Sequence, residues 1–481
     1  MEEQDGITAA AIDNVHLLAG DVHGGHCVPP GGSSRAGSEF LPRLTVVANR
    51  QGDECVTPMH IDRGRRHLRE DRGLMGAHLR IRPRLPRSFR RLLGSAWVSN
   101  TGDGVRNAAL PLIAASLTTS ASTVTIIAAA GTLPFTLFGV VAGTMADRND
   151  RVPLIVRAHL FRAVVGAALA AMLFADEMTV TLLAAGAFLL GCGEALADSA
   201  APALVPDLVD DEELERANSE LETAELVAND LIGPPVGGLL YATASAVPFA
   251  LDAVSFASSA AMVRSIDGST ERPDAIETRS WREDLAEGIT TAWTNRVLRS
   301  TGLLVVILQV GNLAAIAPIV LYVTDRLGVA PAAYGIFLAV GSVGGIAGSR
   351  IAQPAIRRHG SYTTLIAAIV VSILSFLVMT IAWVPAVALG FATSFGAVVV
   401  GRIVVITARQ RSVPSRLLGR AQGAMRTMVW GAATVGALLG GVLADAVGDR
   451  APFVFAAACY VVGGAVSARS LKQVLVDPQR R

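Results

Sequence analysis

The chain has 481 residues, of which 52% are hydrophobic and 17% are charged, and this composition excludes an ordinary soluble globular protein. The net charge of +1 and the 5% aromatic share provide neither the positive field nor the stacking surface of a nucleic-acid-binding protein. The four cysteines are widely spaced and form no C-x-x-C pair, so we expect no metal site, no disulfide framework and no cofactor.

The first 88 residues are polar and are predicted to form a disordered cytoplasmic arm, with eleven Arg between positions 63 and 91. A solvated arm that reinforces membrane orientation and a segment attracted to anionic lipid headgroups both fit this charge. A third interpretation is a translation start at Met75. We favour it for residues 1–74, because they show no periodicity that could form a core.

Long apolar runs follow the arm. A helix needs ~20 mostly apolar residues to cross the ~30 Å hydrocarbon core of a bilayer. Twelve stretches meet this requirement, at residues 94–118, 123–146, 153–174, 179–202, 221–243, 246–265, 300–323, 331–353, 362–382, 385–408, 424–446 and 451–470. The chain is therefore expected to be an all-α integral membrane protein with twelve transmembrane helices.

The spans fall into two halves that share similar sequence motifs. The first half contains Val205-Pro206, Arg216-Ala217-Asn218 and Gly237-Gly238, and the second contains Val413-Pro414, Arg420-Ala421-Gln422 and Gly440-Gly441. Repeated halves are typical of alternating-access carriers. The predicted parts are an arm (1–88), a six-helix bundle (89–266), a cytoplasmic linker (267–298), a second six-helix bundle (299–470) and a cytoplasmic tail (471–481).

Basic residues in the short links predict the orientation of the chain. The links on one side, together with the final tail, carry seventeen Arg or Lys, whereas the opposite links carry only Arg326 and Arg450. Because basic loops remain in the cytoplasm, we expect both termini on the cytoplasmic side of the inner membrane.

The link after the second span reads Gly143-Thr144-Met145-Ala146-Asp147-Arg148-Asn149-Asp150-Arg151. It resembles the cytoplasmic G-x-L-a-D-R-x-G-R signature of the major facilitator superfamily, with departures at the third and eighth positions. The resemblance implies a fold of two pseudo-symmetric six-helix bundles. We expect Gly143 to permit close helix approach and Asp147 to accept hydrogen bonds or cap a helix. Arg148 and Arg151 are expected to pair with acids and form a cytoplasmic gating loop.

The fifth span contains a glycine-proline motif, Gly233-Pro234-Pro235-Val236-Gly237-Gly238. It is similar to the G-P-x-x-G-G signature of drug and proton antiporters in the same superfamily. Gly233 and Gly237 lie one turn apart and let a neighbouring helix pack closely, while Pro234 removes an amide donor and bends the helix. Two interpretations fit this motif. It can be an ordinary helix contact between small residues, or a tight helix contact that seals the outward half so that exchange proceeds without leakage.

The chain from Phe89 onward resembles the bacterial exporters that include macrolide and enterobactin efflux proteins. The cues are Ser99-Asn100-Thr101-Gly102-Asp103-Gly104, Val227-Ala228-Asn229 and Arg409-Gln410-Arg411. The resemblance implies proton-coupled export of small organic molecules, and it names no particular molecule.

Ionisable residues inside the predicted spans are costly to insert, so each one is a functional hypothesis. In the first span Asn100, Asp103 and Asn107 share one helical face, and Arg106 lies three residues after Asp103. We interpret this face as the lining of a water-filled cavity that contacts substrate. The alternative is a buried Asp103–Arg106 pair that only fixes packing.

Three acids are candidate proton carriers. Asp103 and Glu194, in the first and fourth spans, are the leading pair, with Arg106 as the counter-charge. Asp230, beside the glycine-proline motif, is the third. Arg402, deep in the tenth span, can pair with a substrate anion or with one of these acids.

Three other acids are predicted near the ends of their spans. Asp198 is predicted near the cytoplasm, although it shares a face with Glu194 four residues earlier. Asp252 is predicted near the outer end of the sixth span, bonded only to backbone. Asp445 is predicted at the membrane interface.

Together these features predict a secondary transporter that exports a small, amphipathic compound in exchange for protons. The expected partners are this small-molecule substrate, protons and membrane lipid, with no nucleic acid, and the chain is expected to act as a monomer. No nucleophile–base motif argues for an enzyme. Two alternatives stay open: an importer or uniporter of a small metabolite on the same fold, and a transport-inactive membrane sensor or scaffold.

Overall fold

The structure, a computed structural model, describes residues 85–266, 290, 293–412 and 415–476. Within these ranges the regular structure is helical and contains no strand, as the apolar runs predict. The predictions for the arm up to residue 84, for linker residues 267–289 and for residues 477–481 lie outside the described residues.

The N-terminal half begins with four long helices joined by short links. They are α2 (Arg87–Leu117), α3 (Ala121–Arg148), α4 (Arg151–Phe174) and α5 (Val180–Leu204). Two hydroxyl caps fix where α3 and α5 begin: Ser120 accepts a hydrogen bond from the Thr123 amide, and Thr179 accepts one from the Leu182 amide. Such caps satisfy amides that no carbonyl of the helix can reach.

The next stretch changes its helical winding in the middle. Two 3₁₀ turns, η2 (Val205–Asp207) and η3 (Asp211–Glu213), lead to α6 (Leu214–Ala224), the π-helical η4 (Glu225–Ile232) and α7 (Gly233–Thr243), and α8 (Val247–Arg264) ends the half. Pro234 and Pro235 have no amide hydrogen and cannot donate to the carbonyls one turn earlier. The wider π winding directly precedes them, as expected where the regular hydrogen-bond ladder is interrupted.

The C-terminal half repeats the pattern of long helices. Its elements are α10 (Arg296–Ile316), α11 (Ile319–Leu321), η5 (Tyr322–Arg326), α12 (Pro331–Met379), α13 (Val384–Ser412), α14 (Ser415–Val447) and α15 (Ala451–Val476). The long α12 contains the predicted span 331–353 and most of the predicted span 362–382, and it changes direction at Gly360, where φ is 80° and ψ is 161°. Only glycine adopts this backbone conformation readily, so the residue marks the boundary between the two spans.

Eight of the described helices are long and apolar enough to cross a membrane. Because α12 is one of them, these eight cover nine of the twelve predicted spans. The other three predicted spans, 94–118, 221–243 and 246–265, fall on α2, on η4 with α7, and on α8. The count of twelve transmembrane helices stays a prediction. The helices also extend past several predicted boundaries: α2 begins at Arg87, α14 begins at Ser415 and α15 ends at Val476.

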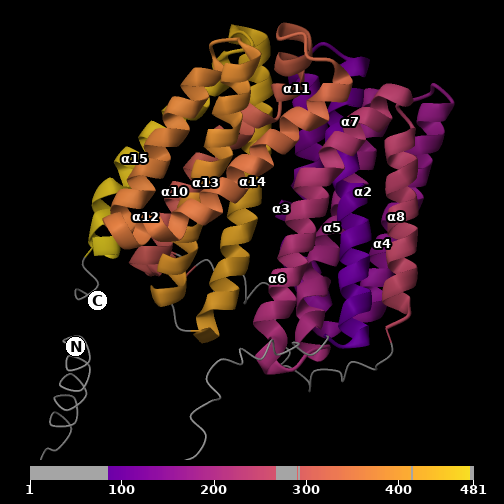
Figure 1. The fold of residues 1–481 in the computed structure, drawn as a ribbon, viewed down its shortest axis with the longest axis horizontal. Coiled ribbons are helices and arrows are strands. Elements are labelled where there is room, and N and C mark those ends of the chain that lie inside the picture. Colours follow the sequence, from indigo (N-terminus) through magenta and orange to yellow (C-terminus); the bar gives the residue numbers. More distant parts are fainter. Residues whose placement is uncertain (1–84, 267–289, 291–292, 413–414, 477–481) are drawn as a thin grey trace, which may run out of the picture. The chain divides into compact units, whose positions relative to one another are not determined.

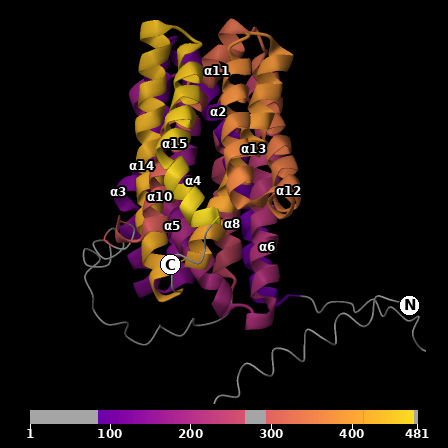
Figure 2. The ribbon, with the colours of Figure 1, turned by 90° about the vertical axis from the view of Figure 1, so that its left-hand side faces the viewer.

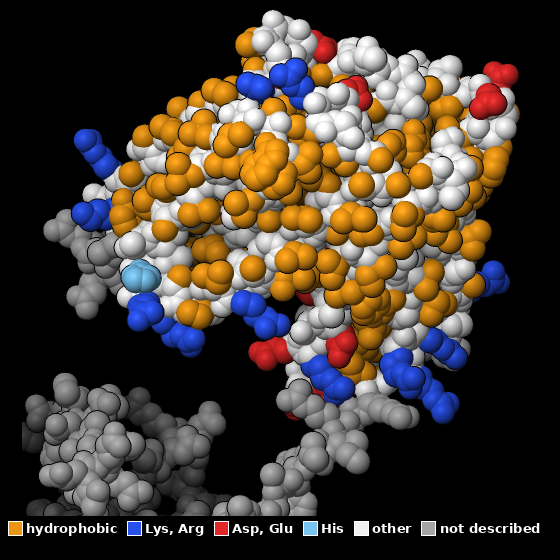
Figure 3. Space-filling view, turned by 45° about the horizontal axis from the view of Figure 1, so that its top comes forward, with side chains coloured by type: hydrophobic (Ala, Val, Ile, Leu, Met, Phe, Trp, Pro, Cys, Tyr) orange, Lys and Arg blue, Asp and Glu red, His pale blue; other side chains and the backbone are white. Residues whose placement is uncertain are grey.

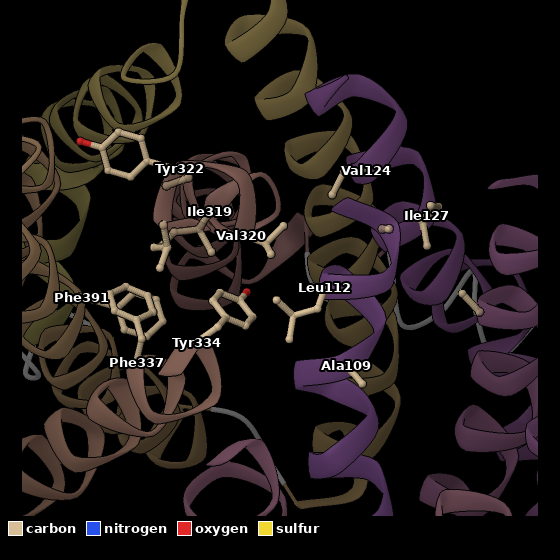
Figure 4. Packing of buried hydrophobic residues seen from close by; sticks show 14 of the residues in the cluster. Ala109, Leu112, Val124, Ile127, Ile319, Val320, Tyr322, Tyr334, Phe337 and Phe391 are labelled. Atoms are coloured by element: carbon tan, nitrogen blue, oxygen red, sulfur yellow. The ribbon is translucent and has the colours of Figure 1, made fainter. Parts of the chain in front are cut away.

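Two helix pairs make the most extensive contacts between the halves. In Figures 1 and 2, α3 runs beside α14. The α7 helix packs against α12. A buried hydrophobic cluster includes side chains from both halves. Figure 4 shows Leu112 of α2 close to Tyr334 of α12, beside the stacked rings of Phe337 and Phe391, whose centroids lie 4.7 Å apart. Close packing of this kind holds membrane helices together, because lipid tails are as apolar as the side chains.

The outer surface of the helices is apolar. Figure 3 shows hydrophobic side chains over most of the helical face, with Lys and Arg gathered along its lower margin. Exposed fractions reach 69% for Val164 and 61% for Val466, values that suit contact with lipid rather than with water. The apolar surface and the long apolar helices both indicate a membrane protein.

Candidate functional site

A group of five charged side chains lies inside the N-terminal half and is called the charge cluster here. Its members come from four helices: Asp103 and Arg106 of α2, Arg162 of α4, Glu194 of α5 and Asp252 of α8. The cluster forms because α2, α4, α5 and α8 pack side by side. Small residues on α2 allow this packing, since a Cβ added at Gly102 would lie 2.7 Å from Asp252 Oδ1.

Within the cluster, each of two arginines is paired with the same two acids. Arg106 Nη2 lies 2.7 Å from Asp103 Oδ1 and 3.0 Å from Glu194 Oε2. Arg162 Nη2 donates to the same Asp103 oxygen and lies 3.2 Å from Glu194 Oε2. Charge-assisted hydrogen bonds of this kind are roughly twice as strong as neutral ones, and these pairings stabilise four charges that would be costly alone in a helical interior.

Burial differs sharply within the charge cluster. The side chains of Arg106 and Arg162 are 6% and 3% exposed, and that of Asp252 is fully buried, whereas Glu194 is 31% exposed. Arg162 Cζ also lies 3.9 Å from the centre of the Phe256 ring, a cation–π contact that supports the guanidinium from its open face. Glu194 is therefore the member of the cluster most open to its surroundings.

The sequence prediction found three of the five members. Asp103, Arg106 and Glu194 lie together, but Arg162 was missed. The prediction that Asp252 bonds only to backbone is wrong, because its carboxyl group lies 3.7 Å from Arg106 Nη1 and accepts no hydrogen bond within the described residues. Arg162 was detectable as an ionisable residue inside the predicted span 153–174. The partners of Asp252 were not, since they depend on which helices meet.

The other candidate residues of the site lie apart from the cluster. Asp230 is exposed in η4, and its carbonyl oxygen accepts a 2.7 Å hydrogen bond from Ser342 Oγ of the other half. Arg402 is exposed on α13 and, among the described residues, forms no ion pair with the predicted acids. On α2, Asn107 Nδ2 donates to Asn229 Oδ1 at 3.0 Å, and Asn100 is half-buried.

The glycine-proline motif packs against two helices at once. A Cβ at Gly233 would lie 2.5 Å from Gly104 Cα, and one at Gly237 would lie 2.9 Å from Val105 Cα, both on α2. A Cβ at Gly238 would lie 3.0 Å from the Ala332 carbonyl oxygen on α12. The motif thus brings α7 into backbone contact with α2 on one face and with α12 of the other half on the adjacent face. Only glycine permits such close approach.

The loop after α3 is only partly described. Arg151, at the start of α4, pairs with Asp207 of η2. At Gly143, where the sequence predicts close helix approach, an added Cβ would meet no atom of the described residues within 4 Å. Gly143 lies on the last turns of α3, away from the surface that packs on a neighbour. The Asp147 side chain lies outside the described part of the chain.

The two halves are also joined through Asp445, near the end of α14 that the sequence predicts to be outermost. The carboxylate accepts hydrogen bonds from the amides of Ala121 and Ser122 at 2.8 and 2.9 Å and from Ser120 Oγ at 2.9 Å. It therefore caps the first turn of α3 from across the interface, where a negative charge also meets the positive end of the helix dipole. Thr132 and Thr434 form a further hydroxyl bond of 2.9 Å between the same helices.

The profile of the family described as transmembrane secretion effector matches residues 81–475. The chain belongs to the major facilitator superfamily. Solved structures agree on the fold: an inward-facing bacterial homologue of the iron transporter ferroportin has a TM-score of 0.61 at 17% identity, and the nucleoside transporter NupG has 0.67 at 12%. These likenesses cover 80% of this chain and 98% and 99% of those chains.

Curated relatives are efflux proteins by name. The multidrug efflux pump Tap of Mycolicibacterium fortuitum is 27% identical over 76% of this chain and 90% of its own length. Tap of Mycobacterium tuberculosis is 28% identical over 81% of this chain and 95% of its own length. Macrolide efflux protein A of Streptococcus pyogenes is 30% identical, over 23% of this chain and 27% of its own length. The predicted superfamily is confirmed, and this member is a membrane transporter rather than an enzyme.

For this superfamily member we expect the variant Asp445→Ala to loosen the contact between α3 and α14. A helix cap contributes about 1 kcal/mol, or roughly fivefold in an equilibrium between joined and separated halves. A cysteine introduced at Thr125, which is fully buried beside Gly441, reports the opening by its rate of labelling with an impermeant maleimide. Asp449→Ala is the matched control, because Asp449 pairs with Arg326 inside the same half. Equal labelling in both variants would contradict the interpretation of Asp445.

Proposed function

We propose that this transporter exports small, amphipathic organic compounds across the inner membrane in exchange for protons. The names of the relatives favour drug efflux. The observation that carries proton exchange is the charge cluster, in which three acids and two arginines are held inside a helical bundle and one acid, Glu194, is partly exposed. Acids in such surroundings can bind and release a proton as access changes.

Export would occur by alternating access of the two halves around a central substrate site. The contacts Asp445 to α3, Thr132 to Thr434 and α7 to α12 join the halves toward the predicted outer end. Nearer the opposite end, Arg426 approaches Asp198 at 3.5 Å, and both side chains are about half exposed. This distribution favours a state closed toward the outside. A proton and a substrate would each shift the equilibrium by binding one state more tightly.

We also propose a membrane location, an orientation and a set of partners for the chain. The chain would lie in the inner membrane with both termini in the cytoplasm, as the basic links predict. It would act as a monomer whose partners are its small-molecule substrate, protons and lipid, and it would not bind nucleic acid. Asp103, Glu194 and Asp230 remain the proposed proton-coupling acids, with Arg106 as counter-charge. Arg402 is the proposed partner of an anionic substrate group.

Deletion and overexpression in a panel of antibiotics and dyes provide the test. We expect overexpression to raise tolerance to at least one compound. We also expect inverted membrane vesicles to accumulate that compound only while their interior is acidic. Accumulation by intact cells would instead indicate an importer. Unchanged tolerance with no flux, at normal membrane levels of the protein, would indicate a sensor or scaffold.

A further inference from the structure

We propose that Asp252 carries the exchanged proton in this conformation. When Asp252 releases the proton, water on the side of the cluster where Glu194 is exposed accepts it. This inference rests on the proposed function and revises one part of it, because it assigns the exchanged proton to Asp252 rather than to Asp103, Glu194 or Asp230. Asp252 lies on α8 and was not among the acids that sequence reasoning selected. Three observations carry the assignment: the number of charges, the missing hydrogen bonds and the packing of neighbouring helices.

The charge cluster holds one acid more than it holds bases. Asp103 and Glu194 each contact both Arg106 and Arg162, so these four groups are mutually compensated. Asp252 is the third acid, and its only ion-pair partner among the described residues is Arg106 Nη1 at 3.7 Å, too long for a hydrogen bond. With all three acids ionised, the cluster would carry a net negative charge inside the bundle, which is unfavourable. A neutral Asp252 removes that excess.

Hydrogen bonding favours the neutral form of the same group. Within the part of the chain that the structure describes, neither carboxyl oxygen of Asp252 has a hydrogen-bond partner, and both are fully buried. An ionised carboxylate is an acceptor only and is strongly destabilised when no donor meets it. The nearby Ser255 hydroxyl donates to the Asp252 backbone carbonyl at 2.7 Å and is not directed at the carboxyl group. Asp252 therefore lacks the donors that a buried anion requires.

The helices α2 and α4, which pack on α8, together with the neighbouring α5 supply the charged and titratable surroundings of Asp252. From α2 come Asp103 and Arg106, from α4 come His159 and Arg162, and from α5 comes Glu194. His159 stacks on Phe256 of α8 at 5.9 Å. The α7 helix offers only Tyr241, whose hydroxyl donates to the Leu112 carbonyl at 3.4 Å. Gly102 of α2 lies directly against the carboxyl group and leaves no room for a side chain between them.

Loss of the proton would change the cluster in a definite way. The carboxylic O–H bond of Asp252 breaks, the electron pair stays on the oxygen, and water on the exposed side of Glu194 takes the proton. Arg106 Nη1, which has no hydrogen-bond partner among the described residues, would then be drawn toward the new carboxylate. That movement would weaken the bonds of Arg106 to Asp103 and Glu194. A single proton thereby couples α8 to α2 and α5.

The variant Asp252→Asn tests this assignment, because asparagine imitates the neutral acid. In inverted vesicles we expect the accumulation ratio of an exported compound to fall about tenfold for a pH difference of one unit, since one coupled proton contributes that factor. Counterflow, the exchange of labelled for unlabelled compound without a pH difference, should stay within about twofold of the unmodified chain. Asp449→Asn removes an exposed carboxyl at the outer end and is the control.

The outcomes separate this inference from the proposed function. If the unmodified chain shows no pH-driven accumulation of any compound, the proposed function fails. If the unmodified chain is active and Asp252→Asn accumulates compound equally, only the assignment of Asp252 fails. Loss of both accumulation and counterflow would also overturn it, because it would indicate a structural role.

Infrared spectroscopy of the purified chain gives a readout independent of transport. At neutral pH we expect the carbonyl-stretch band of a buried, protonated carboxylic acid, and we expect Asp252→Asn to remove it. If that variant does not reach the membrane, the spectrum of the unmodified chain decides, since absence of any such band would overturn the proposal.

Discussion

The variant Arg162→Gln is expected to abolish transport and to destabilise the N-terminal half. Arg162 is 3% exposed and contacts both Asp103 and Glu194, so its removal leaves these two acids with only Arg106 as counter-charge. Removing one partner of a buried ion pair costs about 3–5 kcal/mol, because the remaining charge is buried without compensation. We expect a lower melting temperature in detergent and drug tolerance equal to that of cells without the protein.

Two further variants make the Arg162 result specific. Arg157→Gln removes an exposed arginine from the same helix and should leave both tolerance and melting temperature unchanged. The pair Arg162→Gln with Asp103→Asn removes one charge of each sign. It should be less destabilised than the sum of the single variants, because neighbouring groups in one network are not additive. Additive effects would show that Arg162 and Asp103 do not act together.

The fold could be predicted from sequence because membrane insertion depends on local properties. Span length and apolar content belong to continuous segments, and they located the long helices within a few residues. Helix ends were less predictable where polar residues continue a helix beyond the apolar run. The extension of α15 to Val476 is one such case. The two predicted spans inside α12 were distinguished correctly, since Gly360 interrupts the helix between them.

The charge cluster could be predicted only in part. Asp103 and Arg106 lie three residues apart on one helix, so their pairing follows from helical geometry alone. The links from α2 to Arg162 and Asp252 cross between helices, and no periodicity within one segment encodes which helices meet. Asp252 illustrates the consequence: the sequence suggested bonds to backbone only, whereas the packing of α2 and α4 on α8 buries its side chain beside Arg106.

The glycine-proline motif shows the same limit. Its small residues predict close packing, but the sequence does not say that Gly233 and Gly237 meet α2 while Gly238 meets α12. The structure thereby connects two features that the sequence presents separately. Gly104, which meets Gly233, directly follows Asp103 of the charge cluster. A shift of α7 on α2 would therefore act on the helix turn that carries the charged pair Asp103 and Arg106.

This connection predicts that Gly237→Val disables transport although Gly237 contacts no charged group. An added Cβ would lie 2.9 Å from the Val105 Cα, which belongs to backbone and cannot swing aside. Overpacking of this kind costs about 1–3 kcal/mol and moves one helix relative to the other. We expect a lower melting temperature and a loss of pH-driven accumulation in vesicles, with Gly237→Ala intermediate between the unmodified chain and the valine variant.

The control for Gly237 is Gly139→Val on α3, where an added Cβ meets no atom within 4 Å. Both substitutions place a β-branched residue within a helix, so they share the intrinsic cost and differ in what the side chain meets. We expect Gly139→Val to remain close to the unmodified chain in melting temperature and accumulation. If the two valine variants behaved alike, contact between α7 and α2 would not matter. The contact between α7 and α2 would then be ordinary helix packing without influence on the charge cluster.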